Sequence, residues 1–70
     1  MTERDEAIAA FVRAYWAERG YSPSLREIGA AVGMRSTSMV RYRLDKLEAA
    51  GVIERTPGIS RSIRLRASLT

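Results

Sequence analysis

Three glycines divide this chain into segments of different periodicity. Gly20, Gly33 and Gly51 each follow a stretch in which apolar residues recur every three or four positions, the spacing of an amphipathic α-helix. Glycine readily adopts the left-handed conformation that commonly ends such a helix. The sequence therefore predicts three short helices in succession, with only residues 33–36 left to join the second helix to the third.

Capping residues support the beginnings of these helices. The candidate N-caps are Thr2, Ser24, and Ser36 or Thr37. A carboxylate stands three residues after each of the first two, at Asp5 and Glu27, in the arrangement of a capping box. We therefore expect helices that begin at these caps, the third one running to Ala50.

The apolar residues of each helix lie on one face, which we expect to form the core. They are Ile8, Phe11, Val12, Tyr15 and Trp16 in the first helix, Leu25, Ile28 and Val32 in the second, and Val40, Leu44 and Leu47 in the third. Gly29 lies on the inner face of the second helix. Because glycine there costs about 1 kcal/mol relative to alanine, its presence indicates that another helix approaches closely.

After Gly51 the period changes from helical to extended. The pattern predicts a short strand at 52–55, a type II turn at Pro57 and Gly58, and a second strand at 62–66. Polar and apolar residues alternate in the second strand, which places its apolar side chains inward and its arginines outward. The chain is therefore expected to end in a β-hairpin with a basic outer face.

The order of these elements is that of a winged helix-turn-helix. The predicted fold is mainly α with a small β-hairpin (α+β), in which residues 1–66 form one domain and 67–70 a flexible tail. In such a fold the third helix fits the major groove of DNA, which is about 12 Å wide. The hairpin, or wing, can lie along the adjacent backbone and contact phosphates.

The composition excludes most catalytic and metal sites. The chain has no Cys and no His, so it lacks thiolate nucleophiles, imidazole bases and the usual zinc ligands. Lys46, the only Lys, is expected on the helix surface rather than in a catalytic Ser–Lys pair. We expect no enzymatic activity, no metal or cofactor and no small-molecule ligand. No segment approaches the ~20 apolar residues of a membrane span, and acids precede the most apolar run, so we expect a cytoplasmic protein without membrane contact.

Positive charge is concentrated in the second half of the chain. Residues 1–34 carry four basic and five acidic side chains, whereas residues 35–70 carry eight basic and three acidic ones. All the basic residues except Lys46 are Arg, whose planar guanidinium suits phosphate oxygens and the O6 and N7 atoms of guanine. The distribution favours a double-stranded DNA partner bound through the second half.

The candidate contact residues lie on the third helix, the turn before it and the hairpin. They are Arg35, Ser38, Arg41, Tyr42, Arg43, Arg61, Arg64 and Arg66. Arg41 is the leading candidate for a base contact, and the hairpin arginines are expected to contact phosphates. The alternative for the helix is a solvated face on which Arg41 pairs with Asp45 four residues later. The alternative for the hairpin is an edge strand protected by charge.

Four spaced motifs carry a family resemblance. They are GYSPSLREIGAAVG at 20–33, RSTSMVRYRL at 35–44, LEAAGVIE at 47–54 and GISRSIRL at 58–65. Together they resemble the winged-helix DNA-binding domain of LexA-type SOS repressors over roughly residues 8–66. Because several motifs agree in order and spacing, the resemblance is specific.

The resemblance implies a transcriptional repressor that binds a palindromic operator as a homodimer. It also implies base reading by the start of the third helix, which corresponds here to Ser36, Ser38, Met39, Arg41 and Tyr42. The residues at Met39, Arg41, Tyr42 and Arg43 differ from the usual ones of the family, so the operator sequence is not carried over. Family members continue into a self-cleaving Ser–Lys peptidase domain, and self-cleavage is not expected of these 70 residues.

Two classes of protein remain compatible with the sequence. One is a DNA-binding regulator, either the N-terminal part of a LexA-like repressor or a small stand-alone protein. The other is a winged-helix adaptor or antirepressor that binds another protein. An adaptor would expose an apolar face on its third helix. The charged residues Arg41, Asp45 and Lys46 on that face favour DNA.

Overall fold

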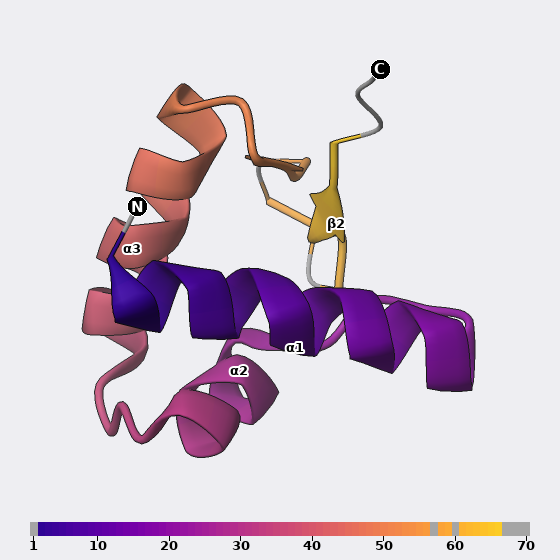
Figure 1. The fold of residues 1–70 in the computed structure, drawn as a ribbon, viewed down its shortest axis with the longest axis horizontal. Coiled ribbons are helices and arrows are strands. Elements are labelled where there is room, and N and C mark those ends of the chain that lie inside the picture. The colour runs from indigo at the N-terminus through magenta and orange to yellow at the C-terminus, as the bar shows by residue number, and fades with distance from the viewer. Residues whose placement is uncertain (1, 57, 60, 67–70) are drawn as a thin grey trace.

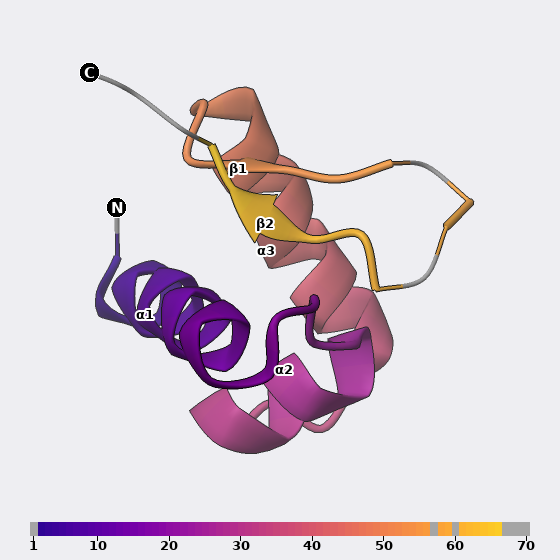
Figure 2. The same ribbon diagram turned by 90° about the vertical axis from the view of Figure 1, so that its right-hand side faces the viewer.

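Three helices and a two-stranded antiparallel sheet make up the described part of the chain, which in this computed structural model covers residues 2–56, 58–59 and 61–66. The elements are α1 (Glu3–Arg19), α2 (Leu25–Val32), α3 (Thr37–Ala49), β1 (Ile53–Glu54) and β2 (Arg64–Leu65). Figures 1 and 2 show α2 on one side of α1 and the strands on the other, with α3 running from the level of α2 to the strands. The predicted winged helix-turn-helix is confirmed. None of these helices is long and apolar enough to cross a membrane.

The helix ends follow the predicted caps closely. In both capping boxes the N-cap hydroxyl accepts from a backbone N–H three residues later, while the carboxylate there accepts from the N-cap N–H. Ser36, not Thr37, caps α3, since its Oγ accepts from the backbone N–H of Met39 at 3.4 Å. The helix ends at Ala49, one residue before the predicted end. At the end of α2, Gly33 has φ 76°, which lets the chain turn directly into the segment before α3.

One core joins all three helices to the hairpin. Its buried residues are Ile8, Val12, Ile28, Met34, Val40, Leu44, Leu47, Ile53 and Ile63. Met34, predicted only as part of a turn, is 7% exposed and belongs to this core. Its backbone N–H donates to Gly29 O at 2.8 Å, so the turn folds back onto α2. A Cβ on Gly29 would lie 2.7 Å from Met34 O in the turn and 3.3 Å from Val40 Cγ2 of α3, so the close approach predicted for a helix is made chiefly by the turn.

The strands of the hairpin are shorter than predicted. Ile53 pairs with Leu65 and Glu54 with Arg64, whereas the sequence pattern indicated strands at 52–55 and 62–66. At the loop end the Oγ of Ser62 accepts from the Thr56 backbone N–H at 3.0 Å, so a side chain replaces the next ladder bond. Gly58 has φ 79°, as the predicted type II turn requires, but Pro57 lies outside the described residues, as does the predicted tail at 67–70.

Two hydrogen bonds attach the residue just before β2 to the rest of the fold. The indole N–H of Trp16 donates to Ile63 O at 2.8 Å, and the Ile63 N–H donates to the Oγ of buried Ser22 at 2.9 Å. Both backbone groups of Ile63 are therefore satisfied by α1 and the segment after it. Because Ile63 is buried, this anchoring sets the position of the hairpin beside α3.

Candidate nucleic-acid interface

The outer face of α3 carries the predicted base-reading residues. The helix buries Val40, Leu44 and Leu47, and this burial turns its opposite side to solvent. The predicted residues of the N-cap and first turns are all exposed, as is Arg35 in the turn just before: Ser36, Ser38, Met39, Arg41 and Tyr42. Met39 and Tyr42 are 58% and 56% exposed, unusually high for large apolar side chains. The structure therefore brings these six residues together on one accessible surface.

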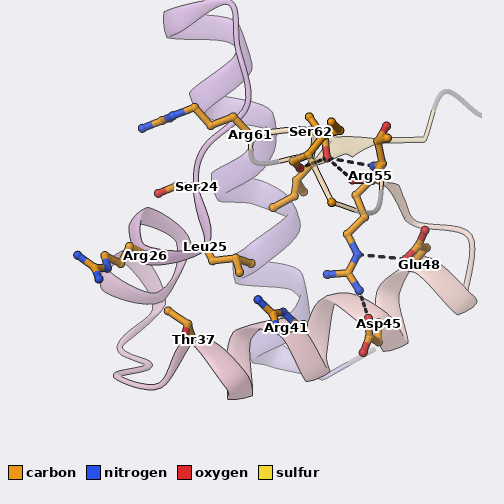
Figure 3. Close-up of a pocket in the computed structure, with 14 residues that line it drawn as sticks. Ser24, Leu25, Arg26, Thr37, Arg41, Asp45, Glu48, Arg55, Arg61 and Ser62 are labelled. Carbon is orange, nitrogen blue, oxygen red and sulfur yellow. Dashed lines mark hydrogen bonds and ion pairs between the residues drawn. The ribbon is translucent and has the colours of Figure 1, made fainter.

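An open groove separates α3 from the wing. It has a volume of about 1050 Å³ and is bounded by the start of α2, by α3 and by the loop of the hairpin. Figure 3 shows arginines from each of these elements around it: Arg26, Arg41, Arg55 and Arg61. The acids Asp45 and Glu48 also line the groove, on the α3 side. The charge of the groove therefore depends on how these acids are paired.

Arg55, which follows β1, forms ion pairs with both acids and offsets part of their negative charge. Its guanidinium forms ion pairs with Asp45 and with Glu48, the latter at 3.2 Å (Figure 3). The side chain is only 18% exposed. Burial lowers the pKa of Arg55, and the nearby charge of Arg41 lowers it further. No sequence signal identified Arg55, because the partners lie on a different element.

The i,i+4 pair of Arg41 with Asp45, which was the alternative to a DNA contact, is not formed. Asp45 binds Arg55 instead, and within the described residues no carboxylate lies at ion-pair distance from Arg41. An exposed i,i+4 pair contributes only a few tenths of a kcal/mol. A partly buried arginine held by two carboxylates one helical turn apart displaces it. Arg41 is therefore exposed and without an ion-pair partner in this part of the chain.

Arg61 joins the wing to the beginning of α2. Its Nη1 and Nη2 donate to the two carboxylate oxygens of Glu27 at 2.9 and 3.2 Å, and Nη1 also donates to Ser22 O and to the Tyr15 hydroxyl. Arg61 has φ 55°, rare for a residue with a side chain. The Arg61 guanidinium, followed by the Ser24 backbone N–H, holds the pKa of Glu27 at about 2, far below its ordinary value of 4.5. From the sequence, Arg61 was expected to contact phosphates, and its intramolecular partners were not predicted.

Arg43 and Arg64 also have intramolecular partners. Arg43 lies 3.7 Å from Asp5 Oδ1, a buried oxygen without a hydrogen-bond partner in the described ranges, and so links α3 to the N-terminus of α1. Arg64 pairs with Glu54 across the hairpin at 3.2 Å, with its side chain 64% exposed. Arg43 therefore lies on the side of α3 that faces α1, whereas the Arg64 side chain is exposed on the wing.

Comparison with known proteins identifies the family. The model of the LexA DNA binding domain matches residues 1–62. The chain belongs to the LexA DNA-binding domain family. The predicted resemblance is thereby confirmed, and the hairpin and α3 described above belong to a LexA-type winged helix-turn-helix.

Similar full-length proteins are LexA repressors of mycobacteria. The chain is 46% identical over 68 residues to that of Mycolicibacterium smegmatis, 47% over 66 residues to that of Mycobacteroides abscessus, and 44% over 68 residues to that of Mycobacterium tuberculosis. These matches cover 97%, 94% and 97% of this chain but only 28–30% of the relatives. The chain therefore spans under a third of the length of these repressors.

Acid is expected to destabilise this LexA-type domain through Glu27. Its pKa is lower in the folded than in the unfolded chain, so its pairing with Arg61 contributes stability above about pH 4.5 that is lost as the pH falls toward 2. Urea unfolding at several pH values between 6 and 2 measures this loss. Glu27→Gln is the matched control, because glutamine keeps the capping-box acceptor without the charge. Parent and variant curves of identical pH dependence would contradict the assignment.

Proposed function

We propose that this chain is the operator-binding part of a LexA-type transcriptional repressor that acts in the SOS response. The observation that carries the proposal is the exposed face of α3, where Arg41 has no ion-pair partner within the described residues and projects beside the groove. The family match supports DNA binding, and the relatives are named LexA repressors. Repression and the palindromic operator are inferences that extend this support.

Each residue has a role in the proposed complex. The beginning of α3 enters the major groove, where Arg41 donates two hydrogen bonds to O6 and N7 of a guanine. The exposed apolar surfaces of Met39 and Tyr42 suit the C5-methyl groups of thymine. Ser38 adds a hydroxyl to the same face. The turn and cap residues Arg35 and Ser36 lie at the edge of the face, where they reach the sugar-phosphate backbone.

The wing supplies affinity rather than sequence preference. Arg64 stands exposed on β2 and is proposed to contact a phosphate in exchange for its surface pair with Glu54. Arg43 and Arg61 are proposed to contact phosphates with N–H groups that their intramolecular pairs leave open, since a guanidinium has five donors. These two residues also hold α3 and the wing in place, through Asp5 and Glu27 respectively.

A protein-binding adaptor is the second candidate, and one observation favours it. Met39 and Tyr42 expose large apolar side chains on α3, the feature expected of a protein-docking face. Arg41 and Lys46 flank them on the same helix, and Lys46 lies over the Tyr42 ring at 5.3 Å. This mixture of positive charge and apolar surface suits the edges of base pairs better than an apolar partner.

Selection of bound sequences from a random duplex pool tests the function. We expect the free protein to sediment as a monomer at micromolar concentration, because the main apolar faces of its helices are used by the core. On DNA, two copies should select half-sites about 10 base pairs apart, centre to centre. A tight dimer without DNA would contradict the assembly. Enrichment of no sequence would contradict the operator.

Salt dependence separates the two candidate functions. Affinity for the selected duplex should fall steeply as salt is raised, with a slope of log K against log salt near −0.9 for each phosphate neutralised. An adaptor would show no duplex retention at low salt, in which case the exposed α3 face would be assigned to a protein.

A further inference from the structure

Arg41 and Asp45 stand four residues apart on α3, the spacing at which opposite charges on an isolated helix attract each other. In the folded domain this attraction is not used, because Asp45 forms its ion pair with Arg55 (Figure 3). A residue of the wing therefore determines whether the Arg41 guanidinium has an ion-pair partner on its own helix.

Arg55 is held firmly enough to keep Asp45. Its Nε donates to Glu48 Oε1 at 3.2 Å, so the guanidinium is fixed by two carboxylates on successive turns of α3. The side chain is largely buried, at 18% exposure, whereas Asp45 is mostly exposed and accessible to competitors. The Arg55 guanidinium is thus shared between Asp45 and Glu48, and Arg41 lines the same groove.

Arg55 also acts on Arg41 by repulsion. The charge of Arg41 contributes to the lowered pKa of Arg55, so the two guanidinium groups lie close enough to interact. Both residues line the same groove. Repulsion from Arg55 and the engagement of Asp45 elsewhere therefore both oppose an ion pair between Arg41 and Asp45.

We propose that Arg55 is a positioning residue for recognition: by occupying Asp45 it keeps the Arg41 guanidinium unpaired and presented to the duplex. The inference deepens the proposed operator binding and rests on it. Arg55 touches no base in this account. Without Arg55, the Arg41 guanidinium folds back onto Asp45 and is no longer available to the duplex, and Glu48 loses its ion-pair partner.

The test compares Arg55→Met, Asp45→Asn and the double variant on the selected operator and on a scrambled duplex. Methionine keeps the apolar stem of Arg55 and removes its charge. Arg55→Met is expected to lower the preference for the operator by about threefold to tenfold, part of the loss expected when Arg41 is removed. Asp45→Asn alone should retain the preference, and adding it to Arg55→Met should restore the preference to within about twofold, since Arg41 then has no carboxylate to fold onto.

A measurement without DNA keeps the proposal testable even if Arg55→Met is less stable. In the NMR spectrum of the free variant, hydrogen exchange at the Arg41 Nε–H should slow as the new pair with Asp45 forms. The double variant should return it to the parental rate. Thermal melts establish that each variant is folded, and Arg64→Met, which removes the hairpin pair with Glu54, is the matched control. It should weaken both duplexes alike and leave the preference unchanged.

The outcomes are distinct. Unchanged Arg41 exchange in Arg55→Met, an unchanged preference, or no rescue by Asp45→Asn would each overturn the proposal while the parent still binds its operator. A parent protein that prefers no duplex overturns the proposed function, and this inference with it.

Discussion

Replacing Gly29 by leucine is expected to destabilise the domain by about 1–3 kcal/mol. A Cβ at this position would lie 2.7 Å from Met34 O and 3.3 Å from Val40 Cγ2. The nearer atom belongs to the backbone of the turn between α2 and α3, so it cannot move aside as a side chain would. The substitution should force α2 away from α3 and loosen the position of α3 as well as the core. Urea or thermal unfolding measures the effect.

Two further variants make this prediction specific. Alanine stabilises an ordinary helix interior by about 1 kcal/mol relative to glycine, so Gly29→Ala should reverse that sign if the close contact governs the site. Ala30→Leu, one residue later on the exposed side of α2, controls for the added bulk and should change stability little. If Gly29→Leu melted like the parent, the close approach of the turn would not limit this position.

The fold was predictable from the sequence because its signals are local. Both capping boxes join residues three positions apart, and the glycines that end the helices act on their own backbone. The buried faces of α2 and α3 follow from a periodicity read within a single helix. The main differences are that Met34 enters the core from the turn, and that the strands are shorter because the Ser62 side chain takes over a backbone bond near the hairpin loop.

The pairing of the charged residues was not predictable, because it joins different elements of the fold. Arg55 and Arg61 find Asp45 and Glu27 only after the wing has been placed against α3 and α2. The spacing of Arg41 and Asp45 left a local pair open as the alternative to a DNA contact, and it is not formed because Arg55 of the wing pairs with Asp45 instead. The sequence could therefore nominate the exposed residues of α3 but not say which of their charges are free.

The lack of an intramolecular partner in the described residues makes Arg41 the residue whose removal should most change sequence preference. Arg41→Ala is expected to cost about 1–3 kcal/mol on the best operator and to flatten the preference at one position in each half-site. Arg64→Ala removes a charge from the wing and is expected to weaken binding to all duplexes alike, with a salt slope lower by about one unit for each phosphate that is no longer neutralised. The difference arises because the base edge at a given position changes with the DNA sequence, whereas the phosphate does not.

Titration of both variants against the selected operator and a scrambled duplex, at several salt concentrations, distinguishes base reading from phosphate binding. For Arg41→Ala the two affinities should converge, whereas for Arg64→Ala they should fall in parallel. Glu54→Gln is a useful companion to Arg64→Ala, because it frees Arg64 from its pair across the hairpin and should strengthen binding to both duplexes. If Arg41→Ala instead weakened binding equally on both duplexes, Arg41 would be a phosphate anchor. Base reading would then have to be assigned to Ser38 and Tyr42, whose exposed hydroxyl groups lie within the first turns of α3.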